Sequence, residues 1–246
     1  MFKQLNLEDI YAFPVAGDAG CAIGAAMWYA KGVHGQKIEP ISHAYFGPAA
    51  SEIQILSALQ KTAFKISKPD NIAEASATLL AEHKIMGWFQ GRMEGGARAL
   101  GARSILSNPS SVENKDAVNI RVKFREPWRP FAPSILYEKR QRFIGSLIHA
   151  PFMTVTFEVP EEARQEIPGA MHVDNTIRVQ TVKRDVNPLY YDTIAAFESK
   201  TGVPVLTNTS FNRKGEPIVN TPEEALAMFG ATEMDALAIG PYLVTK

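Results

Sequence analysis

The sequence predicts an α/β protein, with α+β as the alternative, because strand-like and helix-like segments alternate along most of the chain. The chain has 246 residues, of which 46% are hydrophobic and 21% charged, values typical of a globular protein with one large core. The residue pattern changes near residue 45. We therefore expect a short first part, residues 1–45, and one large domain, residues 46–246, with no internal repeat.

The first part contains a Gly-rich turn and then a helix of small residues, within VAGDAGCAIGAAMWYAKG. Ala22, Ala25, Ala26 and Tyr29 would let this helix pack very close to a neighbour. Residues 33–50 have no clear period and several helix breakers, so they are predicted to form a linker. Because the first part is too short to make a domain, we expect it to be the tail of something larger.

In the second part, hydrophobic periodicity identifies most elements. Ile72, Ala75 and Leu79 share one face of a helix, and apolar residues alternate with polar ones through 152–159 as in a half-buried strand. A capping box with proline at the first helical position starts a helix at Thr221. We predict strands at 85–89, 152–159, 176–182, 203–207 and 237–245, and helices at 71–83, at 188–200 with a stop at Gly202, and after Thr221. The strand order does not follow from these patterns.

Composition argues against several classes of protein. The formal net charge is zero, so neither nucleic acid nor a membrane surface is favoured as a partner. No apolar run reaches the roughly 18 residues that a membrane span needs, and MFKQLNLEDI lacks the features of a signal peptide. Cys21 is the single cysteine, which excludes an internal disulfide and fits a reducing compartment, so we expect a cytoplasmic protein.

Positive charge is concentrated in residues 87–134. They hold eight Lys or Arg against four Asp or Glu, and glycines interleave with three of the arginines. Glycines let backbone amides approach a ligand closely, and arginines bind phosphate oxygens through paired N–H groups. The segment therefore suits a polyphosphate or an acyl phosphate, but it suits a solvated charged face equally well. The spacing of Gly96 and Gly101 is not a Walker A loop, because Ala102 stands where lysine is required.

Two prolines stiffen the end of this segment, RPFAPS, residues 129–134. A stiff backbone beside Arg125 and Arg129 could hold both guanidinium groups in a fixed geometry for an anion. The alternative is a strand edge with surface arginines. Trp128 is interpreted as a core or rim packing residue rather than a stacking platform.

Two later segments are rich in polar side chains. In HVDNTIRVQTV, residues 172–182, the alternation of polar and apolar residues favours a solvent-facing side. TNTSFNRKGEPIV, residues 207–219, places small donors and acceptors after a strand, where α/β folds often bind ligands, and an ordinary polar loop is the alternative.

Side chains for metal binding or covalent catalysis are few. Asp18 lies in a Gly-rich turn before the first helix, where a carboxylate could ligate a metal, although a helix cap is the favoured interpretation. Cys21 lies outside the polar motifs and no Gly-x-Ser-x-Gly occurs, so a covalent nucleophile is not indicated.

Four segments, in their order along the chain, resemble the C-terminal domain of NodU/CmcH/TobZ-type O-carbamoyltransferases. They are GRMEGGARALGARSIL, VKFREPWRPFAPS, HVDNTIRVQTV and TGVPVLTNTSFNRKGEPIV. The resemblance runs from about residue 46 to the end, and AGDAGCAIGAA resembles the end of the family's actin-like N-terminal domain. It implies a YrdC-like mixed, twisted sheet with flanking helices, preceded by a remnant of the actin-like domain and a linker. Asn175 departs from the family's usual glycine, and the rest of the N-terminal portion is missing.

The resemblance also implies an activity. A YrdC-like domain would join carbamoyl phosphate and ATP, with Mg²⁺, into carbamoyl adenylate and release pyrophosphate. An actin-like domain with bound iron would pass the carbamoyl group to a hydroxyl acceptor, so this chain would supply the adenylate-forming half and need the missing domain as partner. Fixed cations in a dry pocket would stabilise the charge on the leaving pyrophosphate. The implied catalytic residues are Arg98, Arg103, Lys123, Arg125 and Arg129, and the implied substrate- or nucleotide-binding residues are Arg92, Ser104, Ser134, Arg178, Asn208, Thr209, Ser210 and Asn212.

By the same resemblance, Asp18 matches a metal ligand of the actin-like domain. The histidine pair that would complete that iron site, spaced His-x3-His, does not occur in the chain, so we expect an incomplete site and no complete transfer by this chain alone. Two alternatives stay open: a YrdC-like module that binds RNA, which the neutral overall charge disfavours, and a non-catalytic fragment that needs its missing domain. The acceptor and the oligomeric state do not follow from the sequence.

Overall fold

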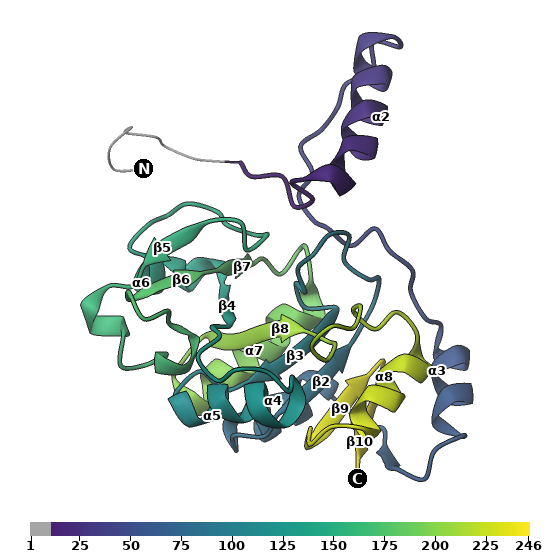
Figure 1. Ribbon diagram of the computed structural model, residues 1–246, viewed down its shortest axis with the longest axis vertical. Coiled ribbons are helices and arrows are strands. Elements are labelled where there is room, and N and C mark those ends of the chain that lie inside the picture. Colours follow the sequence, from purple (N-terminus) through teal and green to yellow (C-terminus); the bar gives the residue numbers. More distant parts are fainter. Residues whose placement is uncertain (1–10) are drawn as a thin grey trace.

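The computed structural model describes residues 11–246, and a large mixed sheet forms their centre (Figure 1). The strand order is β1-β10-β9-β2-β3-β8-β4-β7, with β2–β9 and β4–β7 parallel and the other neighbours antiparallel. This mixed topology confirms the predicted α/β sheet with flanking helices. The strands are β1 (Lys65–Ser67), β2 (Met86–Phe89), β3 (Arg103–Ser107), β4 (Ala132–Leu136), β7 (Gln180–Val182), β8 (Val205–Ser210), β9 (Ala236–Ile239) and β10 (Tyr242–Thr245).

Helices cover both faces of the sheet, because strand residues alternate between two cores. Trp88 packs with α4 (Ile72–Ala81) and α7 (Pro188–Thr201), whereas its neighbour Phe89 packs with α3 (Glu52–Leu59) and α8 (Pro222–Gly230). Val118 and Val122, from a π-helical turn (Val118–Val122) that continues α5 (Val112–Ala117), join the second core. Among residues 11–246, no helix has the length and apolarity needed to cross a bilayer.

A smaller layer packs against the β4 end of the sheet. Strands β5 (Thr156–Glu158) and β6 (Thr176–Arg178) form a second, two-stranded antiparallel sheet. Its inward residues Phe157 and Ile177 pack with α6 (Arg140–Ile144) through Phe143 and with Ile135 of β4. This layer places Arg178 beside the large sheet.

The first helix, α2 (Cys21–Gly32), projects away from the domain (Figure 1). None of its residues is buried, and Trp28 and Tyr29 are exposed. The expectation that its small residues pack against a close neighbour is therefore not met within the described chain.

Residues 44–49 do not behave as a free linker, and we call them the strap. Gly95 N–H donates to the Ala44 carbonyl (2.6 Å), Gly47 N–H donates to Met93, and Met93 N–H donates to Pro48 (both 2.9 Å). The strap therefore pairs with the turn that follows β2 and belongs to the domain rather than to α2.

Most predicted elements are present, but three sequence predictions were wrong in detail. The single strand predicted at 237–245 is the hairpin β9–β10, which turns at Gly240 (φ 53°). Residues 176–182 form β6 and β7, which belong to different sheets, and only 156–158 of the strand at 152–159 pairs. The helices at 71–83 and 188–200, the left-handed stop at Gly202 and the capping box at Thr221 are confirmed.

Candidate functional site

Four strands bring the predicted polar motifs to one end of the large sheet. Ser104, at the start of β3, pairs with Ser210 at the end of β8, and Ala132, at the start of β4, pairs with Asn208. Gln180, the first residue of β7, lies in register with Ser134 of β4 (parallel pair). Segments that are distant in the sequence therefore meet where these strands begin or end.

Lys123 is a buried cation at this end of the sheet. It follows the π-helical turn, and its ammonium Nζ lies 2.7 Å from the Ser210 carbonyl and 2.8 Å from the Asn212 carbonyl. The Asn212 Oδ1 (2.7 Å) and the Ser210 Oγ (3.2 Å) complete its oxygen neighbours. Burial, reinforced by the positive charge of Arg125, lowers the pKa of Lys123 to about 7.

Arg125 and Arg129 extend the positive charge of Lys123 toward solvent. Arg125 Nε donates to Asn119 Oδ1 (2.7 Å), and its guanidinium carbon lies 4.9 Å from the centre of the Phe131 ring. Arg129 is half-buried and forms an ion pair with Glu126 (2.9 Å). Burial, and then repulsion from Arg129, lower the pKa of Arg125 from its ordinary value.

A buried polar network forms the floor of the site. Ser134 Oγ donates to Gln180 Oε1 (2.8 Å), and Asn208 Nδ2 donates to Ser134 Oγ (3.1 Å). Gln180 Nε2 donates to the Leu100 carbonyl (2.7 Å), which also accepts a hydrogen bond from the Tyr45 hydroxyl of the strap (2.8 Å). The predicted residues Ser134 and Asn208 are thus brought together, and they fix each other's orientation. Thr209 is half-buried in β8, level with Ile105.

The glycine-rich loop before β3 wraps around the buried carboxylate of Glu94. One carboxylate oxygen accepts the backbone N–H groups of Leu100 and Ala102 (both 2.7 Å), and both oxygens accept from Arg103 N–H (3.2 Å). Burial outweighs these hydrogen bonds and raises the pKa of Glu94. Ser104 Oγ accepts from Gly101 N–H (3.1 Å), so this predicted binding residue also supports the loop.

Arg103 is fully buried, and its guanidinium faces backbone carbonyls. It donates to Gln90 (2.9 Å) and Pro48 (3.3 Å) and stacks on the Phe89 ring (3.7 Å to the ring centre). Burial lowers the pKa of Arg103 to about 10, while the carboxylate of Glu94 opposes that shift. Arg103 therefore ties the strap to the sheet. Arg92 is exposed and does the same by donating to the Phe46 carbonyl (2.8 Å).

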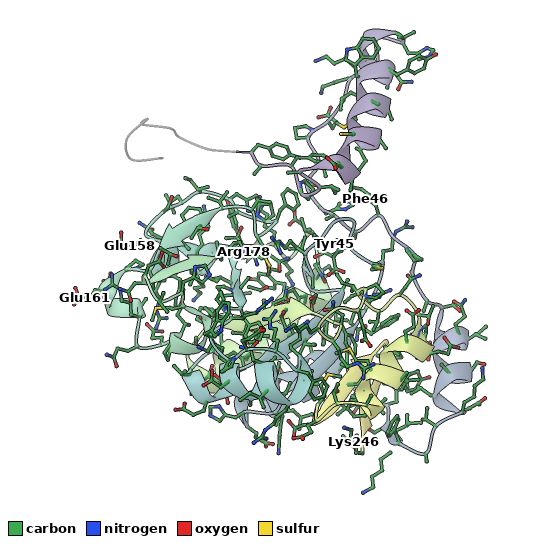
Figure 2. All side chains as sticks on the ribbon, viewed as in Figure 1. Tyr45, Phe46, Glu158, Glu161, Arg178 and Lys246 are labelled. Atoms are coloured by element: carbon green, nitrogen blue, oxygen red, sulfur yellow. The ribbon has the colours of Figure 1, made fainter. Side chains whose placement is uncertain are left out.

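Arg98 and Arg178 form a second pair of cations. Arg178 is half-buried and donates to the Met153 carbonyl (2.8 Å). Burial, and then the like charge of exposed Arg98, lower the pKa of Arg178 to about 10. Figure 2 shows Arg178 and Tyr45 on the side of the domain that faces the linker and α2.

Most of these cations have no carboxylate partner. Among the ion pairs of residues 11–246, only Arg129 of the predicted catalytic residues takes part in one. Lys123, Arg98 and Arg125 do not, although twelve other ion pairs neutralise charge elsewhere in that range. A group of like charges in which, over the same range, Glu126 is the one paired carboxylate keeps excess positive charge, which is suited to binding an anionic ligand.

Asp18 lies apart from these cations, in a 3-10 turn (Asp18–Gly20) before α2, and is exposed. Within the described part of the chain, no group of three His, Cys, Asp or Glu side chains could hold a metal ion. The described residues therefore do not provide a fit for an iron site by themselves.

Two clefts lie between the strap side of the domain and the loops around it. One, of about 560 Å³, is lined by Tyr11, His43, Phe152 and Lys183 among others. The other, of about 400 Å³, is lined by Tyr45, Arg92 and Asn187 among others. Tyr45 is held there by Asn187, whose Nδ2 donates to the Tyr45 hydroxyl (3.0 Å).

Sequence reasoning missed Glu94, Asn119 and Tyr45. Glu94 gave one available signal, since it is the single acidic residue inside a basic, glycine-rich motif. Asn119 and Tyr45 gave none, because their partners are loop carbonyls, 8 and 10 positions away for Asn119 and 55 for Tyr45, that periodicity does not reveal.

Comparison with known proteins identifies relatives of this chain. Nodulation protein NolO of Bradyrhizobium diazoefficiens is 42% identical over 97% of this chain and 45% of its own length. Nodulation protein NolNO of Sinorhizobium fredii is 41% identical over 97% of this chain and 36% of its own length. The chain thus spans less than half the length of these curated relatives.

A solved structure of full-length HypF, in its phosphate- and nucleotide-bound form, shares the fold with a TM-score of 0.51 and 19% identity. The match covers 72% of this chain and 22% of HypF. Residues 77–246 match the family model described as "Carbamoyltransferase C-terminus". Since that match covers more than two thirds of the chain, this protein belongs to the carbamoyltransferase C-terminus family.

Proposed function

We propose that this chain is the adenylate-forming part of an O-carbamoyltransferase, which uses ATP and carbamoyl phosphate to make carbamoyl adenylate. One observation carries the proposal: Lys123, Arg125 and Arg98 lie in motifs that converge on one end of the sheet, without carboxylate partners among residues 11–246. Both substrates carry several phosphate charges, which such a group of cations would neutralise. The nucleotide- and phosphate-bound form of HypF, a protein with the same fold, supports this choice of ligand class.

The proposed reaction balances with water as a reactant. Water cleaves the bond between the carbamoyl group and phosphate, which gives carbamate and inorganic phosphate. A carbamate oxygen then attacks the α-phosphorus of ATP, and a new P–O bond forms while the bond to the β-phosphate bridging oxygen breaks. Pyrophosphate leaves with the electron pair, and carbamoyl adenylate remains. A hydroxyl acceptor later takes the carbamoyl group, and AMP is released.

The predicted site residues fall into two groups: cations that would interact with the substrates, and residues that hold those cations or their loops in position. Arg125 and Arg129 would bind the triphosphate, whose Mg²⁺ arrives with ATP as part of the substrate. Lys123 would add its positive charge to theirs, because its ammonium protons face Ser210 and Asn212. Arg98 and Arg178 would bind carbamoyl phosphate. Charge that develops on the leaving pyrophosphate would meet cations already in place, which is how phosphoryl-transfer sites lower a barrier without a protein nucleophile.

Other predicted residues would support the site from the sheet and from the loop before β3. Ser134 and Asn208 would offer hydrogen bonds from the floor. Arg103, whose guanidinium is occupied by carbonyls, would position the loop rather than touch substrate. Transfer to the acceptor would require a partner domain, and NolO extends beyond this match by more than half of its length. The exposed single cysteine, Cys21, is compatible with a cytoplasmic setting.

Pyrophosphate release from ATP tests the proposal directly. The purified chain should release pyrophosphate only when carbamoyl phosphate is present, and Arg98→Ala and Arg129→Ala should each reduce the rate at least about 100-fold. Arg121→Ala, at an exposed arginine paired with Glu233, is the matched control and should leave the rate unchanged. Absence of release together with absence of calorimetric binding of either substrate would rule out the site for this chain. Binding without release would instead indicate a fragment that needs its partner domain.

A further inference from the structure

Trp128 is the most exposed aromatic residue beside the Lys123 site. Its side chain is 70% exposed, so it is not the packing residue that the sequence suggested. Phe124, four residues earlier, is 52% exposed and has a left-handed backbone (φ 49°). Exposed aromatic surface and a left-handed phenylalanine are both unfavourable for folding alone, and such features concentrate at ligand sites.

The backbone of the loop that carries Trp128 is held by hydrogen bonds from a buried side chain. Asn119 is fully buried, and its Nδ2 donates to the carbonyls of Pro127 (3.2 Å) and Arg129 (3.0 Å), the two neighbours of Trp128. The Oδ1 of the same amide accepts from Arg125 (2.7 Å). One buried amide therefore fixes the backbone on both sides of an exposed indole and orients a cation of the site.

Trp128 is also coupled physically to the cations. The Arg129 guanidinium carbon lies 5.7 Å from the centre of the Trp128 ring, within the range of a cation–π contact. Glu126 pairs with Arg129 and with Lys214 (both 2.9 Å), and so connects this loop to the loop after β8 that holds Lys123. The arrangement places an exposed indole, on a backbone that is hydrogen-bonded at both sides, beside Arg129 of the cation group.

We infer that the indole of Trp128 is a stacking platform for the base of the bound nucleotide, held in position by Asn119. This inference rests on the proposed function, because the phosphates of that nucleotide would occupy the Lys123 and Arg125 cluster. A nucleotide joins a planar aromatic base to several negative charges, and the loop presents the complementary pair of surfaces. Stacking on an aromatic side chain accepts any base, so the platform adds affinity for nucleotides over inorganic polyphosphate.

The test compares ATP with inorganic tripolyphosphate, which has the charges but no base. Calorimetry on the full chain should show that Trp128→Ala weakens ATP binding about 5- to 150-fold. Binding of tripolyphosphate should change less than about twofold, because the cations remain. Trp128→Phe should keep most of the affinity for ATP. Trp28→Ala is the matched control, since Trp28 is 71% exposed but lies on α2.

The outcomes separate this inference from the function on which it rests. If Trp128→Ala weakens the binding of ATP and of tripolyphosphate equally, or changes neither, Trp128 is not a stacking platform, while the proposed phosphate site is unaffected. If the unaltered chain binds neither compound, both proposals fail. If a single-stranded oligonucleotide binds tightly through Trp128 while ATP does not, the platform belongs to an RNA site instead and the inference is overturned.

Discussion

At the scale of the residue, Lys123 is the group whose chemistry depends most on its surroundings. Its ammonium has three protons for four nearby oxygens, and all four belong to Ser210 and Asn212. Burial and Arg125 lower the pKa of Lys123 to about 7, so the charge on this side chain changes near neutral pH. An anionic ligand would restore the charged form, because a nearby negative charge raises the pKa of an amine.

We predict that polyphosphate binding at pH 8 is accompanied by uptake of up to about one proton. The unliganded lysine is mostly neutral at that pH, and the bound phosphate raises its pKa, so affinity falls as pH rises from about 7 to 9. Calorimetry in two buffers of different ionisation enthalpy measures the uptake. Lys123→Met should abolish it, whereas Lys61→Met, at an exposed lysine beyond α3, should not. Unchanged uptake in Lys123→Met would assign the proton to another group.

The sequence identified the types of residue in this site but not their partners. Lys123 and Ser210 are separated by 87 positions, and no local pattern predicts that they touch. The structure explains why asparagine can replace glycine at position 175. Its φ of 61° lies in the left-handed region, where glycine and asparagine are the usual residues, so the departure from glycine at this position preserves the turn.

At the scale of the element, the loop between β2 and β3 has one glycine that no other residue can replace. Gly101 has a φ of 98°, and a Cβ there would lie 2.2 Å from the Tyr190 ring. That ring is fully buried between α7 and the sheet, so it has no room to move. The loop, with Arg98 on it, therefore depends on a contact between backbone and aromatic ring.

We predict that Gly101→Ala destabilises the protein by about 3 kcal/mol or more, because it adds a steric clash to the cost of a left-handed alanine. Gly202→Ala is the matched control: its φ is 77°, but nothing lies within 4 Å of the added Cβ. It should cost only about 1 kcal/mol. Urea denaturation measures both values, and equal losses would show that the Tyr190 contact does not matter.

Local sequence patterns identified some elements and left others out. Helix α4 was found by its apolar residues at helical spacing, and α8 by its capping box at Thr221. Strands β3 and β4 are buried on both faces, so they show no alternation and were not among the predicted strands, although a strand edge was one alternative for residues 129–134. The β9–β10 turn was missed because apolar residues continue on both sides of Gly240.

At the scale of the whole molecule, the boundary of the domain falls before the strap rather than after it. Ala44 is buried, and the Tyr45 hydroxyl reaches the loop carbonyl that Gln180 also contacts. The family model begins later, at residue 77, yet residues 44–49 pair with the turn after β2. The strap is therefore part of the structural unit that forms the site.

We predict that two N-terminal deletions differ sharply in stability. Removal of residues 1–42 leaves the strap in place, whereas removal of residues 1–50 also takes its backbone pairing and the Tyr45 contacts. The longer deletion should melt at least about 5 °C below the shorter one. Scanning calorimetry checks this, and identical melting temperatures would show that the strap contributes nothing to the folded domain.

The burial of Arg103 affects how any survey of arginine substitutions is read. Arg98 and Arg103 lie five positions apart in one motif, yet only Arg98 reaches solvent. Under the proposed function, an alanine at either position would reduce turnover: at Arg98 by removing a contact with ligand, and at Arg103 by releasing Pro48 and the turn after β2. If turnover alone were measured, both arginines would be interpreted as residues that contact substrate. The melting temperature of each variant distinguishes the two roles. It should be unchanged if the arginine contacts only ligand, and lower if the arginine holds the folded chain together.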